Sequence, residues 1–204
     1  GLSEKTDIVF TSDHGELQGD YGLMFKGPYH VDSLLRVPLM WKRATEDESE
    51  VISSPVGHVD LAPTFCKIAG LKVPDWMQGN PLPTSQGGEH SECVLTTFDS
   101  QFSAVGMHLR TIYKGGFICT VYEASTVSQG GKFPVYWRLW GRESEVPQFE
   151  GGEGELYDCN ADPKQFHNLW NDPERQVLRR ELVEELYAQL PAAREPALVP
   201  IAPT

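Results

Sequence analysis

The order of apolar and polar positions predicts two differently built parts in this chain. Ile8-Val9-Phe10 is a continuous apolar run, which is typical of a strand buried on both faces of a sheet. The pattern then predicts a short helical turn at 32–35, a second strand at 37–41, and a helix that follows Asp60 as its N-cap and closes at Gly70. This mixture of strands and helices predicts an α/β fold for the first part.

A connection rich in proline and glycine, residues 72–90, separates this part from a run of strands. Alternating positions predict strands at 93–98, 107–113 and 117–122, the last two joined as a hairpin around Lys114-Gly115-Gly116. A final helix is expected to begin with Asp172 as its cap and Pro173 in its first turn, and to end before Pro191. We therefore expect two units, residues 1–86 and 87–204, the second an antiparallel sheet covered by one helix.

Composition and charge exclude several classes of protein. The 204 residues carry 17 Lys and Arg against 29 Asp and Glu, a formal net charge of −12, so no basic face is expected for nucleic acid or for an anionic membrane surface. No apolar stretch approaches the roughly 18–20 residues that a membrane span requires. The four cysteines form no C-x-x-C pair, which disfavours a zinc ribbon; buried thiols are favoured, and disulfides stay open as an alternative.

Three polar side chains carry the chemistry that the sequence suggests. Asp13 and His14 directly follow the first predicted strand, and a carboxylate beside an imidazole offers two ligands to one divalent cation. The alternative for this pair is a solvated surface turn. Lys26 lies in a glycine-rich loop, from which an ammonium group could hold an anionic substrate oxygen. Its alternative is an exposed lysine at the tip of a loop.

Several motifs occur in this chain together and in a definite order. The first group is Thr11-Ser12-Asp13-His14-Gly15-Glu16, Gly19-Asp20-Tyr21-Gly22-Leu23, Lys26-Gly27-Pro28 and Arg36-Val37-Pro38-Leu39. The others are Gly57-His58-Val59-Asp60-Leu61-Ala62-Pro63-Thr64 and Glu155-Leu156-Tyr157-Asp158, the latter with Asp162-Pro163 and Asn168-Leu169. Together these motifs resemble the C-terminal part of the sulfatase family, within the alkaline phosphatase superfamily. The resemblance implies the C-terminal part of an alkaline-phosphatase-like α/β/α sandwich, followed by a small antiparallel sheet packed with a C-terminal helix.

The resemblance also implies roles for individual residues. Asp13 and His14 match ligands of the active-site divalent cation, which in sulfatases is usually calcium, although an imidazole would also suit manganese or zinc. Lys26 matches the catalytic lysine that contacts the sulfate ester oxygens. Tyr29 and His30, just beyond it, are candidates for lining the substrate pocket. The remaining motif residues are expected to be structural: Arg36, His58, Asp60, Asp158 and Asp162.

The implied nucleophile is absent from this sequence. Sulfatases use a formylglycine made from Cys or Ser in a C/S-x-P-x-R motif, and neither that motif nor the family's Asp-Asp ligand pair occurs in these 204 residues. We therefore expect these groups in a preceding N-terminal part of the same enzyme, and we expect the chain alone to be inactive.

The function that the resemblance implies is the hydrolysis of sulfate monoesters, small anionic substrates. One alternative is a phosphonate monoester or phosphodiester hydrolase of the same superfamily. Another is a catalytically incomplete module that binds partners through its C-terminal sheet and the aromatic segment 135–140. Assembly into a homo-oligomer is left open by the sequence.

Overall fold

The computed structural model describes residues 2–44, 49–84, 87–99, 107–124 and 149–190. The aromatic segment 135–140 lies outside these ranges, and its expected binding role stays a prediction. The helices and strands within them follow in chain order: β1 (Ile8–Thr11), α1 (Asp32–Leu35), β2 (Leu39–Lys42), α2 (Leu61–Ile68), β3 (Cys93–Asp99), β4 (His108–Lys114), β5 (Phe117–Tyr122), β6 (Glu153–Asp158) and α4 (Gln176–Gln189). Short 3-10 turns precede or connect them at Ser3–Lys5, Asp20–Gly22, His58–Asp60 and Pro173–Arg175.

The second part of the chain contains an antiparallel sheet in the order β3-β4-β5-β6. The three strands predicted from alternation and the hairpin between β4 and β5 are confirmed, with Gly115 and Gly116 supplying the positive φ angles of the turn. The fourth strand, β6, was not predicted. It contains Gly154, whose missing side chain makes room for the ring of Trp170, since a Cβ there would lie 2.5 Å from that ring.

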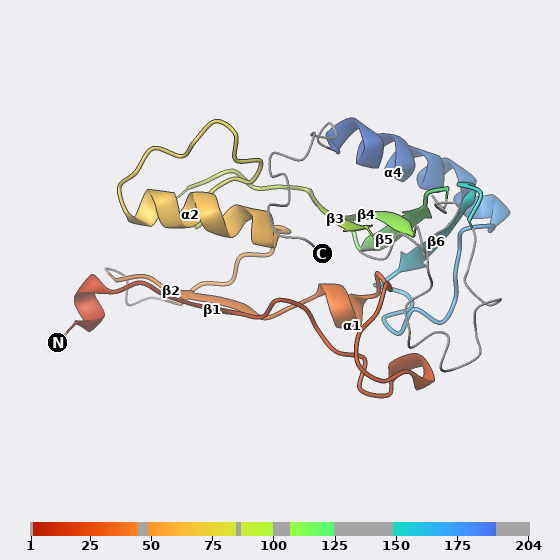
Figure 1. The fold of residues 1–204 in the computed structure, drawn as a ribbon, viewed down its shortest axis with the longest axis horizontal. Helices are drawn as coiled ribbons and strands as arrows, with labels where there is room; N and C mark the ends of the chain where they lie inside the picture. The colour runs from red at the N-terminus through yellow and green to blue at the C-terminus, as the bar shows by residue number, and fades with distance from the viewer. Residues whose placement is uncertain (1, 45–48, 85–86, 100–106, 125–148, 191–204) are drawn as a thin grey trace, which may run out of the picture.

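Helix α4 covers one face of this sheet (Figure 1). One row of residues across the four strands is apolar throughout and forms the main core with two leucines of α4: Leu95, Ile112, Cys119 and Leu156 on the strands, and Leu182 and Leu186 on the helix. Lys114 of β4 also donates to both carboxylate oxygens of Glu185, at 2.8 Å each. Asp172 caps the 3-10 turn Pro173–Arg175 that leads into α4, and not α4 itself, because its Oδ1 accepts a hydrogen bond from the backbone N of Glu174. The expected sheet with one covering helix is therefore present.

The segment that contains α1 meets the sheet on the face opposite α4 (Figure 1). Contact is made through His30, whose Nδ1 lies 2.6 Å from Oγ1 of Thr111 on β4. Strand residues alternate between faces, so Thr111 points away from the α4-facing Ile112 beside it. The sheet thus separates α4 from the segment in which the sequence places its site residues.

Strands β1 and β2 form a separate antiparallel ribbon, in which Phe10 pairs with Met40. The prediction that the first strand is buried on both faces is wrong for this chain: Ile8, Phe10 and Met40 are each more than half exposed. Among the described residues β1 pairs only with β2, and nothing covers this apolar side of the ribbon. An isolated pair of strands is only marginally stable in water, so the ribbon resembles a fragment of a larger sheet.

The helix predicted after Asp60 is α2, but Asp60 does not cap it as expected. A 3-10 turn, His58–Asp60, precedes the helix, and Asp60 instead accepts hydrogen bonds from the backbone N atoms of Gly57 and Asn80, at 2.8 and 2.9 Å. Its carboxylate therefore joins the beginning of α2 to the connection that follows the helix. The predicted turn role of Asp158 is confirmed, since its Oδ1 accepts from the backbone N atoms of Asn160 and Ala161.

All four cysteines are free thiols, with Cys93 and Cys119 buried, as the sequence favoured. No helix in the described ranges is both long enough and apolar enough to cross a membrane.

Candidate active site

The segment Ser12–Gly15 leaves β1 and is held in place by two other elements. The backbone N of Gly15 donates to the carbonyl oxygen of Leu34 in α1, at 2.9 Å. Nε2 of His58, in the turn before α2, lies 2.8 Å from the carbonyl oxygen of Ser12 and donates to it. Ser12 Oγ in turn donates to the carbonyl oxygen of His14 at 2.9 Å. The backbone that carries Asp13 and His14 is therefore fixed between β1, α1 and α2.

The side chains of Asp13 and His14 face each other at this point. His14 Nδ1 lies 2.8 Å from the carbonyl oxygen of Gly15, which can only accept, so Nδ1 carries the hydrogen. In a neutral ring, Nε2 is then the atom with the free lone pair, and it lies 3.3 Å from Oδ2 of Asp13. The hydrogen bond from the backbone N–H of His14 to Oδ1 of Asp13, at 3.0 Å, lowers the pKa of Asp13, which keeps the exposed carboxylate ionised.

This arrangement fits a bound cation. Two electron-pair donors that face each other attract a positive charge between or beside them, and a ring N–H bonded to a backbone carbonyl is the usual support of a metal-binding histidine. Among the described residues, however, no group of three or more His, Cys, Asp or Glu is placed to hold a metal ion. The part of the chain that the structure describes thus offers two candidate ligands, and a stable metal site would require more ligands from elsewhere.

Lys26 is brought back to the same segment by a hairpin-like loop. The backbone N of Leu17 donates to Phe25, and that of Gly19 donates to Leu23, so the chain returns beside Glu16. Lys26 Nζ lies 3.3 Å from Glu16 Oε1, and both side chains are partly exposed. Such a pair contributes at most about 1 kcal/mol, so exchanging Glu16 for a substrate anion costs little.

The loop between Glu16 and Lys26 is strained, and the C-terminal part of the chain holds it. Every described non-glycine residue with positive φ belongs either to this loop or to its contact: Gln18, Tyr21, Phe25 and Gln165. Tyr21 Oη donates to the carbonyl oxygen of Lys164, and Gln165 Oε1 accepts from the backbone N of Asp32 at 2.7 Å. Strained backbone persists only where its surroundings enforce it, and it concentrates at functional sites.

Tyr29 and His30, the two candidates for the substrate pocket, have different environments. The Tyr29 side chain is partly exposed and lies over Gly27, where a Cβ would come within 2.7 Å of its ring. His30 is only 5% exposed. Burial, with the nearby positive charge of Arg110, lowers the pKa of His30 to about 4, so its ring is neutral at neutral pH. Tyr29 is thus open to a ligand in this chain, whereas His30 is directed into the contact with β4.

The low pKa of His30 predicts a loss of stability in mild acid. The unfolded chain binds a proton near the ordinary value of 6.5, while the folded chain does so only near 4. As the pH falls through this window the unfolded state is favoured, by up to about 3 kcal/mol, and the effect is absent above it. NMR titration should find this ring neutral well below pH 6.5. A His30→Gln variant should lose less stability across the window than wild type, and an equal loss would contradict the prediction.

The sequence did not indicate some of the residues that position this site. His58 was expected to be structural, and its hydrogen bond to the backbone of Ser12 agrees with that, but the sequence did not indicate which segment it supports. Lys164 and Gln165 follow Asp162-Pro163, a motif that the resemblance also included. Thr111 carries no recognisable motif.

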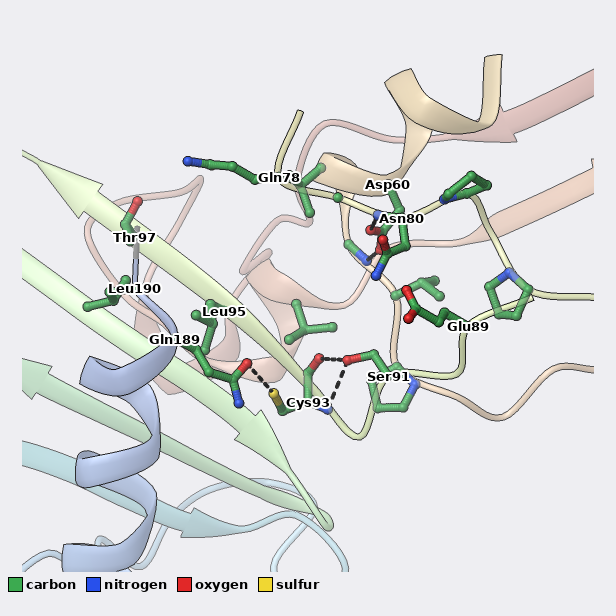
Figure 2. A pocket seen from close by; sticks show the side chains of 18 residues that line it. Asp60, Gln78, Asn80, Glu89, Ser91, Cys93, Leu95, Thr97, Gln189 and Leu190 are labelled. Carbon is green, nitrogen blue, oxygen red and sulfur yellow. Dashed lines mark hydrogen bonds between the residues drawn. The ribbon is translucent and has the colours of Figure 1, made fainter. Parts of the chain in front are cut away.

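A cavity of about 410 Å³ lies away from these residues, at the seam between the two parts of the chain (Figure 2). Asp60, Asn80, Ser91, Cys93 and Gln189 are among the residues that line it. Cys93 Sγ donates to Gln189 Oε1 at 3.3 Å, and Ser91 Oγ donates to the carbonyl oxygen of Cys93 at 2.6 Å, so these groups mainly bond to one another. None of the predicted site residues lines this cavity.

Comparison with known proteins agrees with the motifs. The family model described as Sulfatase matches residues 1–71, the portion that contains Asp13, His14 and Lys26. An uncharacterized sulfatase of Escherichia coli strain K12 is 28% identical over 95% of this chain. An ulvan-active sulfatase of Formosa agariphila is 27% identical over 93% of this chain. Residues 1–71 thus match the sulfatase family model, and nearly the whole chain is similar to sulfatases.

The alignments also show that the chain covers only part of the length of these relatives. It spans 34% of the length of each of those two relatives. The crystal structure of the phosphonate monoester hydrolase of Agrobacterium radiobacter superposes on 91% of this chain and 35% of its own length, with a TM-score of 0.66 and 22% identity. The expected fold class, the C-terminal part of an alkaline-phosphatase-like sulfatase fold, is confirmed.

Proposed function

We propose that this chain is the C-terminal part of a metal-dependent hydrolase of sulfate monoesters. The observation that carries the proposal is the pair of facing donors, Asp13 Oδ2 and His14 Nε2, with Nδ1 of the ring already bonded to Gly15. The match of residues 1–71 to the sulfatase family model and the neighbouring ammonium group of Lys26 support the same conclusion.

Each residue has a distinct role in this proposal. Asp13 and His14 would hold a divalent cation, with calcium expected and manganese or zinc as alternatives, together with ligands from the rest of the protein. When bound, that cation would withdraw charge from the ester oxygens. Lys26 would exchange Glu16 for a sulfate oxygen and hold it as a point charge, and the accessible ring of Tyr29 would contact the organic group. The formylglycine nucleophile is proposed to lie in the preceding part of the enzyme.

The preceding part of the enzyme is also the proposed partner of the exposed ribbon. Ile8, Phe10 and Met40 present an apolar surface beside the site segment, which a neighbouring part of the same sheet would cover. This feature favours one part of an enzyme over a self-contained binding module, which would be expected to bury its own first strand. The net charge of −12 continues to argue against nucleic acid as a partner.

The direct test is an assay of the full-length protein on nitrophenyl sulfate and on a nitrophenyl phosphonate, each with calcium, manganese or zinc. We expect the sulfate to be hydrolysed with the higher kcat/KM, and we expect the 204-residue chain alone to hydrolyse neither substrate. Preference for the phosphonate would assign the protein to the alternative activity. Failure to hydrolyse either substrate with any of these metals would refute the proposal.

A further inference from the structure

A row of buried polar groups connects the segment just after Lys26 and Tyr29 to the C-terminal sheet. Nδ1 of His30 lies 2.6 Å from Oγ1 of Thr111, which lies 2.8 Å from Oγ1 of Thr120 on β5. Thr111 and Thr120 are almost completely buried, and His30 is 5% exposed. His30 and Thr111 are 81 residues apart in the sequence, so this contact fastens two otherwise distant parts of the chain to each other.

The row works as one connected unit. The neutral imidazole of His30 has one donor and one acceptor nitrogen, and each threonine hydroxyl can donate once while it also accepts. Whichever tautomer His30 adopts, the two hydroxyls can orient so that both bonds are made. Removing the hydroxyl of Thr111 breaks both of these bonds and leaves Nδ1 of His30 buried without its partner, which favours a shift of the ring.

A shift of His30 would be transmitted to the site. Tyr29 is its direct neighbour, Lys26 lies four residues before it, and α1 begins two residues after it. Helix α1 provides the carbonyl oxygen of Leu34 that receives the backbone N–H of Gly15, next to the two candidate ligands. The loop that carries Lys26 and the segment that carries Asp13 and His14 therefore share the same support.

We infer that Thr111, acting through His30 and supported by Thr120, is a positioning residue that fixes Lys26 and Tyr29 relative to Asp13 and His14. This inference rests on the proposed function, because its effect on rate requires that these groups act on one ester. According to this inference, the C-terminal sheet contributes to catalysis by positioning other groups, although Thr111 and Thr120 contact no substrate. Displacing a reacting group by about 1 Å can reduce a rate about a hundredfold.

The test compares Thr111→Val, Thr111→Ser and Thr96→Val in the full-length enzyme. Valine keeps the shape of threonine without its hydroxyl, and serine keeps the hydroxyl. Thr96 is the matched control, because it lies opposite Thr111 on β3 and makes no side-chain hydrogen bond with a described residue. We expect Thr111→Val to lower kcat about tenfold to a hundredfold with a smaller change in KM, Thr111→Ser to restore most of the rate, and Thr96→Val to behave as wild type.

A merely structural role would give a different result. Thr111→Val would then lose activity only in proportion to its unfolded fraction, or would keep wild-type kcat, and either outcome overturns the inference. If Thr111→Val fails to fold, Thr120→Val decides, since it removes the second hydroxyl but leaves the His30–Thr111 bond. A severalfold lower kcat in folded Thr120→Val supports the inference, and an unchanged kcat overturns it.

Amide hydrogen exchange separates this inference from the proposed function. Residues 17–31 should exchange faster in the folded valine variant than in wild type, whether or not the protein hydrolyses sulfate esters. If wild type hydrolyses neither ester, the proposed function fails, and the exchange result alone decides whether Thr111 orders this loop. Equal exchange in wild type and variant would overturn the inference.

Discussion

Asp13→Ala in the full-length enzyme is expected to lower kcat on an aryl sulfate by about 10²–10³-fold. The substitution removes the exposed carboxylate that faces Nε2 of His14 at 3.3 Å, and with it half of the proposed ligand pair. Asp13→Asn keeps one oxygen donor without the charge, so it should fall between alanine and wild type. Titration with calcium or manganese should show weaker binding in the same order.

Lys26→Ala tests the proposed substrate-binding group. It should differ from Asp13→Ala in its effect on the affinity for the divalent cation. The loss of the ammonium group should lower kcat by a similar factor while leaving the affinity for the divalent ion near that of wild type. Lys72→Ala is the matched control, because Lys72 is also an exposed lysine paired with a carboxylate, that of Asp75 at 3.2 Å. Near-normal turnover in either Asp13→Ala or Lys26→Ala would show that its assigned role is wrong.

The parts of the fold that the sequence predicted are those in which a local pattern decides the structure. Alternation in Leu109–Tyr113 and the Gly115-Gly116 turn sufficed for the β4–β5 hairpin, and leucines at four-residue spacing sufficed for α4. Strand β6 was not predicted because it contains Gly154. That glycine is explained only by the tertiary contact with the ring of Trp170. The prediction that the first strand is buried was wrong, because apolar residues indicate a covered face without indicating which segment covers it.

In the candidate site, too, the local pairs could be predicted from the sequence and the long-range contacts could not. Asp13 and His14 are neighbours in sequence, so their pairing could be predicted, and the loop that returns Lys26 to Glu16 spans only ten residues. The supports of the site come from Thr111 and Gln165, which reach His30 and Asp32 across 81 and 133 residues. Contacts over such separations leave no periodicity or local motif, so only the folded structure reveals them. The strained loop is consequently understood only together with the C-terminal segment that contacts it through Lys164.

Gly15→Ala is expected to abolish most of the activity without touching a reacting group. A Cβ at this position would lie 1.9 Å from the carbonyl oxygen of Ser33 and 3.2 Å from Cα of Leu34. Both neighbours are backbone atoms of α1 and cannot rotate away as a side chain could. The alanine must therefore break the 2.9 Å hydrogen bond from residue 15 to Leu34 and push Asp13 and His14 away from α1. A displacement of about 1 Å predicts a loss in kcat/KM of about a hundredfold or more.

Gly152→Ala provides the matched control, since nothing lies within 4 Å of its added Cβ and its backbone does not require glycine. It should retain wild-type activity, cation affinity and unfolding temperature. Gly15→Ala, in contrast, should bind the divalent ion more weakly and unfold at a lower temperature, because the clash with α1 displaces the ligand segment and strains the fold together. If Gly15→Ala kept full turnover and full cation affinity, the close approach of α1 could not be what fixes the ligand pair, and its support would have to be sought in the contact between His58 and Ser12 alone.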